Sequence, residues 1–136
     1  MKEPDQELDA VAHSVIGAAI EVHRYLGPGY LESVYEEAMA VELELCGLSF
    51  ERQKPFAIDY ERRAVGEGRM DLLVAKRLVV ELKAVESLAP IHKAQVISYL
   101  KATKCELGLL INFNVEVLKN GVQRVVLTGP SKDTTP

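Results

Sequence analysis

The sequence predicts an α/β fold in which helices pack in layers against a β-sheet. Two segments near the start carry apolar residues at helical spacing, and short β-branched runs follow them. A third helical segment then separates these runs from two further apolar ones. The order helix, helix, three strands, helix, strand, strand is typical of layered α/β domains. Because no repeat or linker interrupts the chain, we expect one domain over residues 1–128 and a flexible tail at residues 129–136.

Three helices are expected from apolar periodicity and from their end signals. The first runs over residues 5–26, where a Gly-Pro-Gly sequence ends it. The second runs over residues 30–46 and has Gly47 as its C-terminal stop. The third covers residues 90–104 and opens with a proline, which fits a first helical position. The short connection between the first two helices favours an antiparallel pair.

The strands are predicted from apolar, β-branched runs and from the turn residues between them. The predicted strands are residues 50–60, the two halves of a hairpin over residues 69–83, residues 107–113 and residues 122–127. Pro55 restricts the first of them to a sheet edge or a bulge. Residues 59–68 are polar and contain glycine, so we expect them to form a connection. Asn120-Gly121 signals a tight turn before the last strand.

Composition places the chain among globular proteins that do not enter membranes. Its 136 residues are 48% apolar and 26% charged, which is ordinary for such a domain. No apolar run approaches the roughly 20 residues that a membrane span requires. The N-terminus opens on acidic residues with no apolar stretch after them, so it does not resemble a signal peptide. Cys46 and Cys105 have no motif spacing, which favours a reducing, cytoplasmic setting.

Charge is distributed unevenly along the chain, whose net charge is −4. Residues 1–51 hold 2 basic and 11 acidic side chains, whereas residues 52–104 hold 11 basic and 6 acidic ones. The basic segment contains the charged residues of the predicted hairpin. This pattern permits a local electropositive surface around an acidic site, and it is equally compatible with a solvated surface of mixed charge.

The predicted hairpin carries ionisable residues inside strands that otherwise read as buried. Asp71 lies in its first strand, and Glu81 and Lys83 lie in its second. Burying a charge is costly unless the charge is paired or binds a metal ion. Strand alternation places Glu81 and Lys83 on the same face. Two carboxylates and an ammonium group on one patch would suit a divalent cation next to a phosphate.

Whether the two carboxylates meet depends on the hairpin register. A two-residue turn at Lys76-Arg77 pairs residue 71 with residue 82, and Asp71 then faces away from Glu81. A three-residue or bulged turn pairs residue 71 with residue 81 and brings the carboxylates together. The turn lacks the Asn-Gly or Gly that a two-residue hairpin prefers, so we expect the longer turn.

The third helix adds Gln95 and Tyr99, which lie four residues apart and therefore on one helical face. Gln95 could orient a water or a phosphate, and Tyr99 could donate a hydrogen bond or simply be a core aromatic. His92 fits a surface position better than a ligand position. Glu32, in the first turn of the second helix, could belong to the site or merely favour the helix dipole.

These residues together resemble the PD-(D/E)xK nuclease superfamily. The ordered set is Asp71, then Glu81-Leu82-Lys83, then Gln95-x-x-x-Tyr99, in which the last pair resembles the branch that contains bacterial recombination exonucleases. Gly29-Tyr30-Leu31-Glu32-Ser33-Val34-Tyr35 resembles the motif that names the GxxExxY family within that superfamily. The resemblance covers nearly the whole chain. One departure is Met70, which stands where the superfamily name has proline.

The resemblance implies a restriction-endonuclease-like core, with a central mixed β-sheet flanked by helices. It implies that Asp71 and Glu81 bind Mg²⁺ or Mn²⁺, with the Leu82 carbonyl as a third ligand and Glu32 approaching the metal directly or through water. Lys83 would assist attack on the phosphate or stabilise the charge that develops there. Gln95 and Tyr99 would complete the catalytic set.

We therefore expect a metal-dependent nuclease that hydrolyses phosphodiester bonds in DNA, with RNA as the other candidate substrate. The alternative is a non-catalytic or accessory nucleic-acid-binding module on the same fold, which the acidic net charge keeps open. Retention of both acids and the lysine favours the enzyme. By analogy with small nucleases that pair to reach both strands, we also expect a homodimer.

Overall fold

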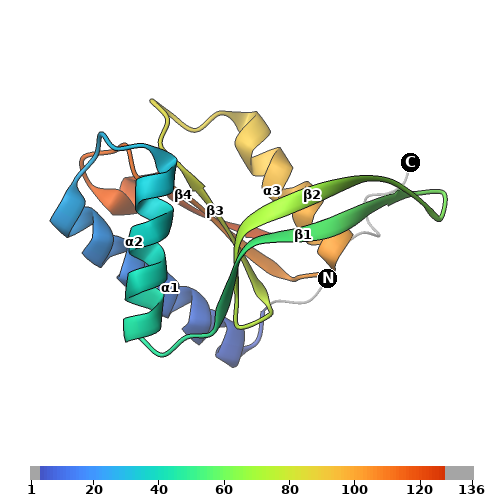
Figure 1. Ribbon diagram of the computed structural model, residues 1–136, viewed down its shortest axis with the longest axis horizontal. Coiled ribbons are helices and arrows are strands. Elements are labelled where there is room, and N and C mark those ends of the chain that lie inside the picture. Colours follow the sequence, from blue (N-terminus) through green and yellow to red (C-terminus); the bar gives the residue numbers. More distant parts are fainter. Residues whose placement is uncertain (1–3, 128–136) are drawn as a thin grey trace.

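The computed structural model describes residues 4–127 and contains a five-stranded sheet between helices (Figure 1). The elements are α1 (Gln6–Leu26), α2 (Glu32–Leu45), β1 (Phe50–Tyr60), β2 (Arg63–Val74), β3 (Leu78–Lys83), α3 (Pro90–Thr103), β4 (Leu107–Asn112), a 3₁₀ turn (Leu118–Gly121) and β5 (Val122–Val126). The strands lie in the order β1-β2-β3-β4-β5. Only β3 and β4 are parallel, joined through α3, so the sheet is mixed, as the resemblance implied. The predicted tail, 129–136, lies outside the described residues.

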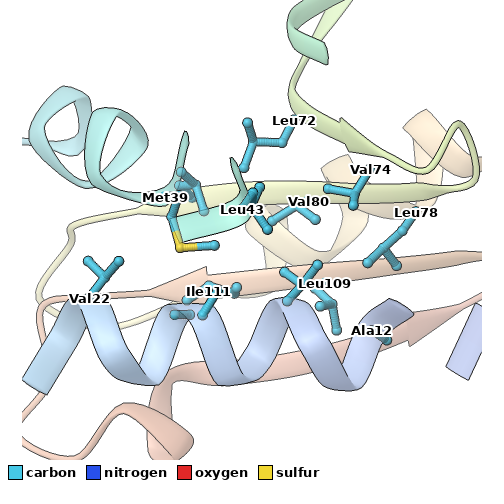
Figure 2. Packing of buried hydrophobic residues seen from close by; sticks show 14 of the residues in the cluster. Ala12, Val22, Met39, Leu43, Leu72, Val74, Leu78, Val80, Leu109 and Ile111 are labelled. Atoms are coloured by element: carbon cyan, nitrogen blue, oxygen red, sulfur yellow. The ribbon is translucent and has the colours of Figure 1, made fainter. Parts of the chain in front are cut away.

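Helices α1 and α2 cover one face of the sheet. Their apolar side chains pack on alternate residues of β2, β3 and β4, which Figure 2 shows from close by. The buried residues from the strands are Leu72, Val74, Leu78, Val80, Leu82, Leu107, Leu109 and Ile111. Helix α3 covers the opposite face, where Val96 and Leu100 pack against Val79 and Leu110. Because strand residues alternate between faces, Glu81 and Lys83 share the α3 face with Val79.

The loop between α1 and α2 is held by a buried tyrosine. The Tyr35 hydroxyl donates to the Gly27 carbonyl at 2.5 Å and accepts from the Tyr30 amide at 3.2 Å. Its ring stacks on Phe113, with centroids 4.5 Å apart. Gly29 has a φ of 112°, in the region that favours glycine. This loop therefore fixes where α2 begins, and with it the position of Glu32.

Residues 59–68, predicted as a connection, instead continue the strands. β1 and β2 pair from Phe50–Val74 to Tyr60–Arg63 and turn at Glu61-Arg62. On the N-terminal side of Leu72, β2 pairs with β1 but no longer with β3. Residues 54–70 therefore form a two-stranded ribbon that leaves the sheet (Figure 1). We call these residues the arm. The prediction was wrong because the exposed ribbon has polar residues around its turn and two glycines on β2, Gly66 and Gly68, which read as a loop.

The remaining predicted elements are confirmed within a few residues of their ends. β1 is an edge strand, as Pro55 required, and β4 is buried along its whole length. Helix α2 ends before Gly47, which has a φ of 76°. No helix within residues 4–127 has both the length and the apolarity needed to cross a membrane.

Candidate functional site

The β2–β3 turn sets the register that the site requires. Three residues, Ala75, Lys76 and Arg77, connect the strands, and the first two have φ values of 53° and 61°. Leu72 pairs with Val80, so the next residues along, Asp71 and Glu81, stand opposite each other. The expected longer turn is confirmed. Sequence rules for tight turns look for glycine or asparagine at left-handed positions. They do not detect this turn, because alanine and lysine occupy those positions.

Asp71 and Glu81 each accept a hydrogen bond from the backbone of the opposite strand. The Asp71 amide donates to Glu81 Oε2 at 2.8 Å, and the Leu82 amide donates to Asp71 Oδ2 at 2.8 Å. These side-chain contacts begin where the backbone pairing of the two strands ends, at Leu72 and Val80. The carboxylates therefore occupy the opening between two diverging strands, held from both sides.

Burial raises the pKa of both carboxyl groups, and for Glu81 the Asp71 charge adds to this effect. Glu81 is only 4% exposed, and its burial together with the Asp71 charge raises its pKa to about 8. Burial also raises the pKa of Asp71, which the Leu82 amide and the Gln53 amide partly oppose. Near neutral pH the metal-free protein thus favours the protonated form of Glu81.

Lys83, Gln95 and Tyr99 lie beside these acids on the α3 side. Lys83 Nζ donates to Gln95 Oε1 at 3.3 Å. The positive charge of Lys83 lowers the pKa of the Glu81 carboxyl group and so opposes part of the increase. Burial, followed by the nearby Glu81 and Asp71, raises the pKa of the Tyr99 hydroxyl, and Gln95 opposes this. The Tyr99 ring also packs edge-on against Phe56 of the arm, with centroids 4.8 Å apart. Tyr99 is therefore both a packing residue and a neighbour of the acids.

Glu32 approaches the same patch from the first turn of α2. Burial raises the pKa of its carboxyl group, while Lys83 and the Ala84 amide lower it and Asp71 raises it. Within residues 4–127, however, no three His, Cys, Asp or Glu side chains are close enough to hold a metal ion together. Glu32 thus lies in the electrostatic neighbourhood of Asp71 and Glu81 without completing a three-acid cage.

Gln53 and Glu36 are site neighbours that the sequence analysis missed. The Gln53 amide donates to Asp71 Oδ1 at 3.3 Å and to Glu36 Oε1 at 2.8 Å. Gln53 has a φ of 49° in the middle of β1, and such non-glycine conformations concentrate at functional sites. Glu36 lies one helical turn after Glu32, which was the available signal. Nothing in the sequence around Gln53 indicates its contact with Asp71.

Asn112, at the end of β4, fixes the chain that follows Lys83. It is 1% exposed, and its Oδ1 accepts from the Val85 amide at 3.0 Å. Its Nδ2 donates to the Val85 carbonyl at 2.9 Å. The Phe113 amide also donates to the Lys83 carbonyl at 2.9 Å. These bonds hold the end of β3, and therefore Lys83, against β4.

Two of the three histidines make structural contacts. His92 Nδ1 accepts from the Ala89 amide at 2.9 Å, which caps the start of α3. His23 is buried, and its Nε2 lies 2.7 Å from the Val115 carbonyl oxygen. Neither contact involves Asp71 or Glu81. His92 is partly exposed, and its capping contact gives it a structural role at the start of α3.

The donor set fits a hard divalent cation. Both side-chain donors are carboxylate oxygens, and a cation between them would offset the burial that raises both pKa values and the Asp71 charge that raises the pKa of Glu81. The Leu82 carbonyl leaves the strand on the same edge as its amide, which faces Asp71. Mg²⁺ is commonly held by one or two carboxylates, with waters and phosphate oxygens completing its shell. Two acids and one carbonyl are therefore sufficient for such a site.

The sequence model described as "PD-(D/E)XK nuclease superfamily" matches residues 9–125, which include every element from α1 to β5 in whole or in part. The chain belongs to this superfamily. PD-(D/E)XK nucleases act on nucleic acids and generally use divalent metal ions. The mixed sheet flanked by helices is the restriction-endonuclease-like core expected of a PD-(D/E)XK protein.

Among solved structures, a phage related exonuclease from Haemophilus somnus 129PT is similar, with a TM-score of 0.42 and 10% sequence identity. The match covers 96% of this chain and 81% of that one. Among curated proteins, no sequence matches the chain.

Proposed function

We propose that the protein is a metal-dependent nuclease that hydrolyses phosphodiester bonds in DNA, with Asp71, Glu81 and Lys83 at its centre. The observation that carries the proposal is the pair of facing carboxylates in the opening between β2 and β3, with Lys83 two residues beyond Glu81. A fold that required only stability would have apolar residues at these half-buried and buried positions.

Each residue has a role that follows from its contacts. Asp71, Glu81 and the Leu82 carbonyl would hold Mg²⁺ or Mn²⁺, with Glu32 acting through water. A bound divalent ion supplies polarisation of the scissile phosphate and lowers the pKa of an attacking water. The ammonium group of Lys83 would stabilise the negative charge that develops on the phosphate.

Gln95 would fix the Lys83 ammonium group, because the two side chains are in hydrogen-bond contact. Tyr99 lies close enough to both acids for their charges to raise the pKa of its hydroxyl. This hydroxyl would donate to a phosphate oxygen or a water. Gln53 would orient Asp71 by donating to the oxygen that the Leu82 amide does not use.

Several finer features belong to the same proposal. The Gly29–Tyr35 segment supports membership of the GxxExxY family, since each named position has a physical role: a left-handed glycine, a site-facing glutamate and an anchoring tyrosine. We also propose a homodimer, which would let the protein reach both strands of a DNA duplex. The free cysteines Cys46 and Cys105 are consistent with a cytoplasmic setting, which we propose as well.

Metal binding is the first test. Calorimetric titration with Mn²⁺ or Mg²⁺ should give binding to the wild type and a large loss in Asp71→Ala. The matched control is Asp59→Ala, an exposed aspartate of the arm that should bind as the wild type does. Absence of binding in the wild type would refute the catalytic proposal and leave the accessory-module alternative.

Cleavage is the second test. Single-stranded, duplex and flapped DNA, each with an RNA counterpart, should be incubated with Mg²⁺ or Mn²⁺ and either wild type or Lys83→Ala. We expect cleavage of DNA by the wild type only. Equal activity in the two proteins would identify a contaminating nuclease, and preferred cleavage of RNA would reverse the substrate assignment.

A further inference from the structure

The arm, residues 54–70, projects from the strand that carries Asp71 and has no packing role for most of its length. Every residue from Ala57 to Glu67 is exposed, on both strands and both faces. An isolated two-stranded ribbon is at best marginally stable in water. A ribbon of this kind that persists beside a candidate active site suggests a surface for a binding partner.

The base of the arm is nevertheless rigid. Phe56 pairs directly with Gly68, and a Cβ atom at position 68 would overlap the Phe56 ring. Glycine therefore lets the ring lie across the neighbouring strand, where its edge meets Tyr99 of α3. The base of the ribbon is thus packed against α3 beside the site, whereas the residues from Ala57 to Glu67 are exposed. Packing at the base fixes the direction in which the ribbon projects.

The arm presents cations that no carboxylate of the described chain neutralises. Arg62, Arg63 and Arg69 are exposed and take part in none of the ion pairs formed within residues 4–127. Tyr60, next to the turn, is 69% exposed. A hollow of about 380 Å³ between the arm and α3 is lined by Lys101 among others. Cations unpaired within the described chain and an exposed aromatic side chain on one projecting ribbon match a nucleic-acid surface.

The shape of the arm selects among nucleic acids. The seven residues of β1 from Lys54 to Tyr60 extend about 23 Å at about 3.3 Å per residue. The major groove of B-DNA is about 12 Å wide and admits a two-stranded ribbon. The deep, narrow major groove of A-form RNA does not admit side chains. Asp59, Glu61 and Glu67 also lie on the arm, so it offers both donors and acceptors, as groove contact requires, and is not a uniform phosphate clamp.

We infer that the arm docks in the major groove of duplex DNA and guides the duplex to the Asp71–Glu81 site. The inference rests on the proposed function in taking a nucleic acid as substrate, and it narrows that substrate to duplex DNA. A register skip that leaves Val65 unpaired opposite the Ile58–Asp59 step adds a bulge to the arm. Bulges increase twist and bending, which would help the ribbon follow the groove.

The test is binding without cleavage. Fluorescence anisotropy in the presence of a chelator measures the affinity for a labelled 20-base-pair DNA, for its RNA counterpart and for single-stranded DNA. The variant carries Arg62→Gln and Arg63→Gln. The control carries Arg24→Gln and Lys119→Gln, which make the same charge change at exposed positions of α1 and the 3₁₀ turn. A second variant, with Arg63→Gln and Arg69→Gln, leaves the turn residue Arg62 intact.

We expect both arm variants to bind duplex DNA more weakly than the control. If two phosphate contacts are lost, the slope of log affinity against log salt should decrease by roughly 2, so the wild-type advantage shrinks about tenfold between about 50 and 200 mM salt. The wild type should prefer duplex DNA to duplex RNA. Arm variants that match the control, or equal affinity for both duplexes, would overturn the inference.

Failure of the arm and failure of the proposed function are separate outcomes. A wild type that binds duplex DNA through the arm but does not cleave it with Mg²⁺ or Mn²⁺ refutes the nuclease proposal alone. A wild type that cleaves, with Lys83→Ala inactive and the arm variants unimpaired in binding, refutes the arm alone.

Discussion

Replacing Glu81 by glutamine should make the metal-free protein more stable at neutral and higher pH. Burial and the Asp71 charge raise the pKa of the Glu81 carboxyl group from 4.5 to about 8 in the folded state. The folded state therefore disfavours the charged form, and the free energy of unfolding falls as pH rises from about 4.5 to about 8. Below about pH 4.5 the carboxyl group is protonated in both states and this effect is absent.

The magnitude follows from the size of the shift. Each pKa unit corresponds to about 1.4 kcal/mol, so the raised pKa of Glu81 lowers the free energy of unfolding by on the order of 3 kcal/mol at pH 7, 4 at pH 8 and 5 well above pH 8. Glutamine can still accept from the Asp71 amide, but its buried NH₂ group needs a partner and costs about 1–3 kcal/mol without one. We expect a net stabilisation of about 1–3 kcal/mol near pH 8 and a destabilisation near pH 4.5.

Urea denaturation at pH 4.5, 6, 7 and 8.5, with a chelator present, measures this crossover. Glu44→Gln, an exposed change on α2, is the matched control and should show no crossover. A difference between wild type and Glu81→Gln that stays constant with pH would refute the reasoning, because it would mean that the Glu81 charge is not penalised in the folded state.

Three further changes probe the surroundings of the site. Gln53→Ala removes a donor from a site carboxylate and should weaken Mn²⁺ binding by about 10–100-fold in calorimetry, with Gln123→Ala on β5 unaffected. Tyr35→Phe leaves a loop carbonyl without its donor and should lower the unfolding free energy by about 1–3 kcal/mol in urea. Gly68→Ala must displace the Phe56 ring, so we expect about 1–3 kcal/mol of destabilisation by thermal melting; an unchanged melting temperature would show that the ring moves freely.

Elements with strong periodicity were predictable from the sequence because local signals and packing agree in them. Helix α1 follows a regular apolar pattern and ends at a glycine, and the buried β4 is a continuous apolar run. The arm was not predictable, because both of its faces are exposed and an exposed ribbon has no period-2 apolar signal. The Glu61-Arg62 turn also lacks the glycine or asparagine that would have marked a hairpin there.

The site was predictable in its charged residues and in its register, but not in its outer contacts. Asp71, Glu81 and Lys83 were visible because charges within apolar strands are unusual. The pairing of Asp71 with Glu81 was inferred from the absence of a tight-turn signal and is confirmed by the Leu72–Val80 pairing. The contact of Gln53 with Asp71 depends on β1–β2 register and on a left-handed backbone conformation, and neither leaves a trace in the sequence.

The divergence of β2 and β3 links the stability of the fold to the chemistry of the site. Beyond Leu72 and Val80 the strands no longer pair, and the amides of Asp71 and Leu82, which have no backbone partner on the opposite strand, donate to the two carboxylates. The same acids that would hold a cation therefore replace backbone hydrogen bonds of the sheet. Changing Asp71 to alanine removes a metal ligand and also leaves the Leu82 amide without its partner, so loss of binding in that variant has two sources. Asparagine at position 71 keeps an acceptor for the amide while removing the charge, and comparing Asp71→Asn with Asp71→Ala separates the two.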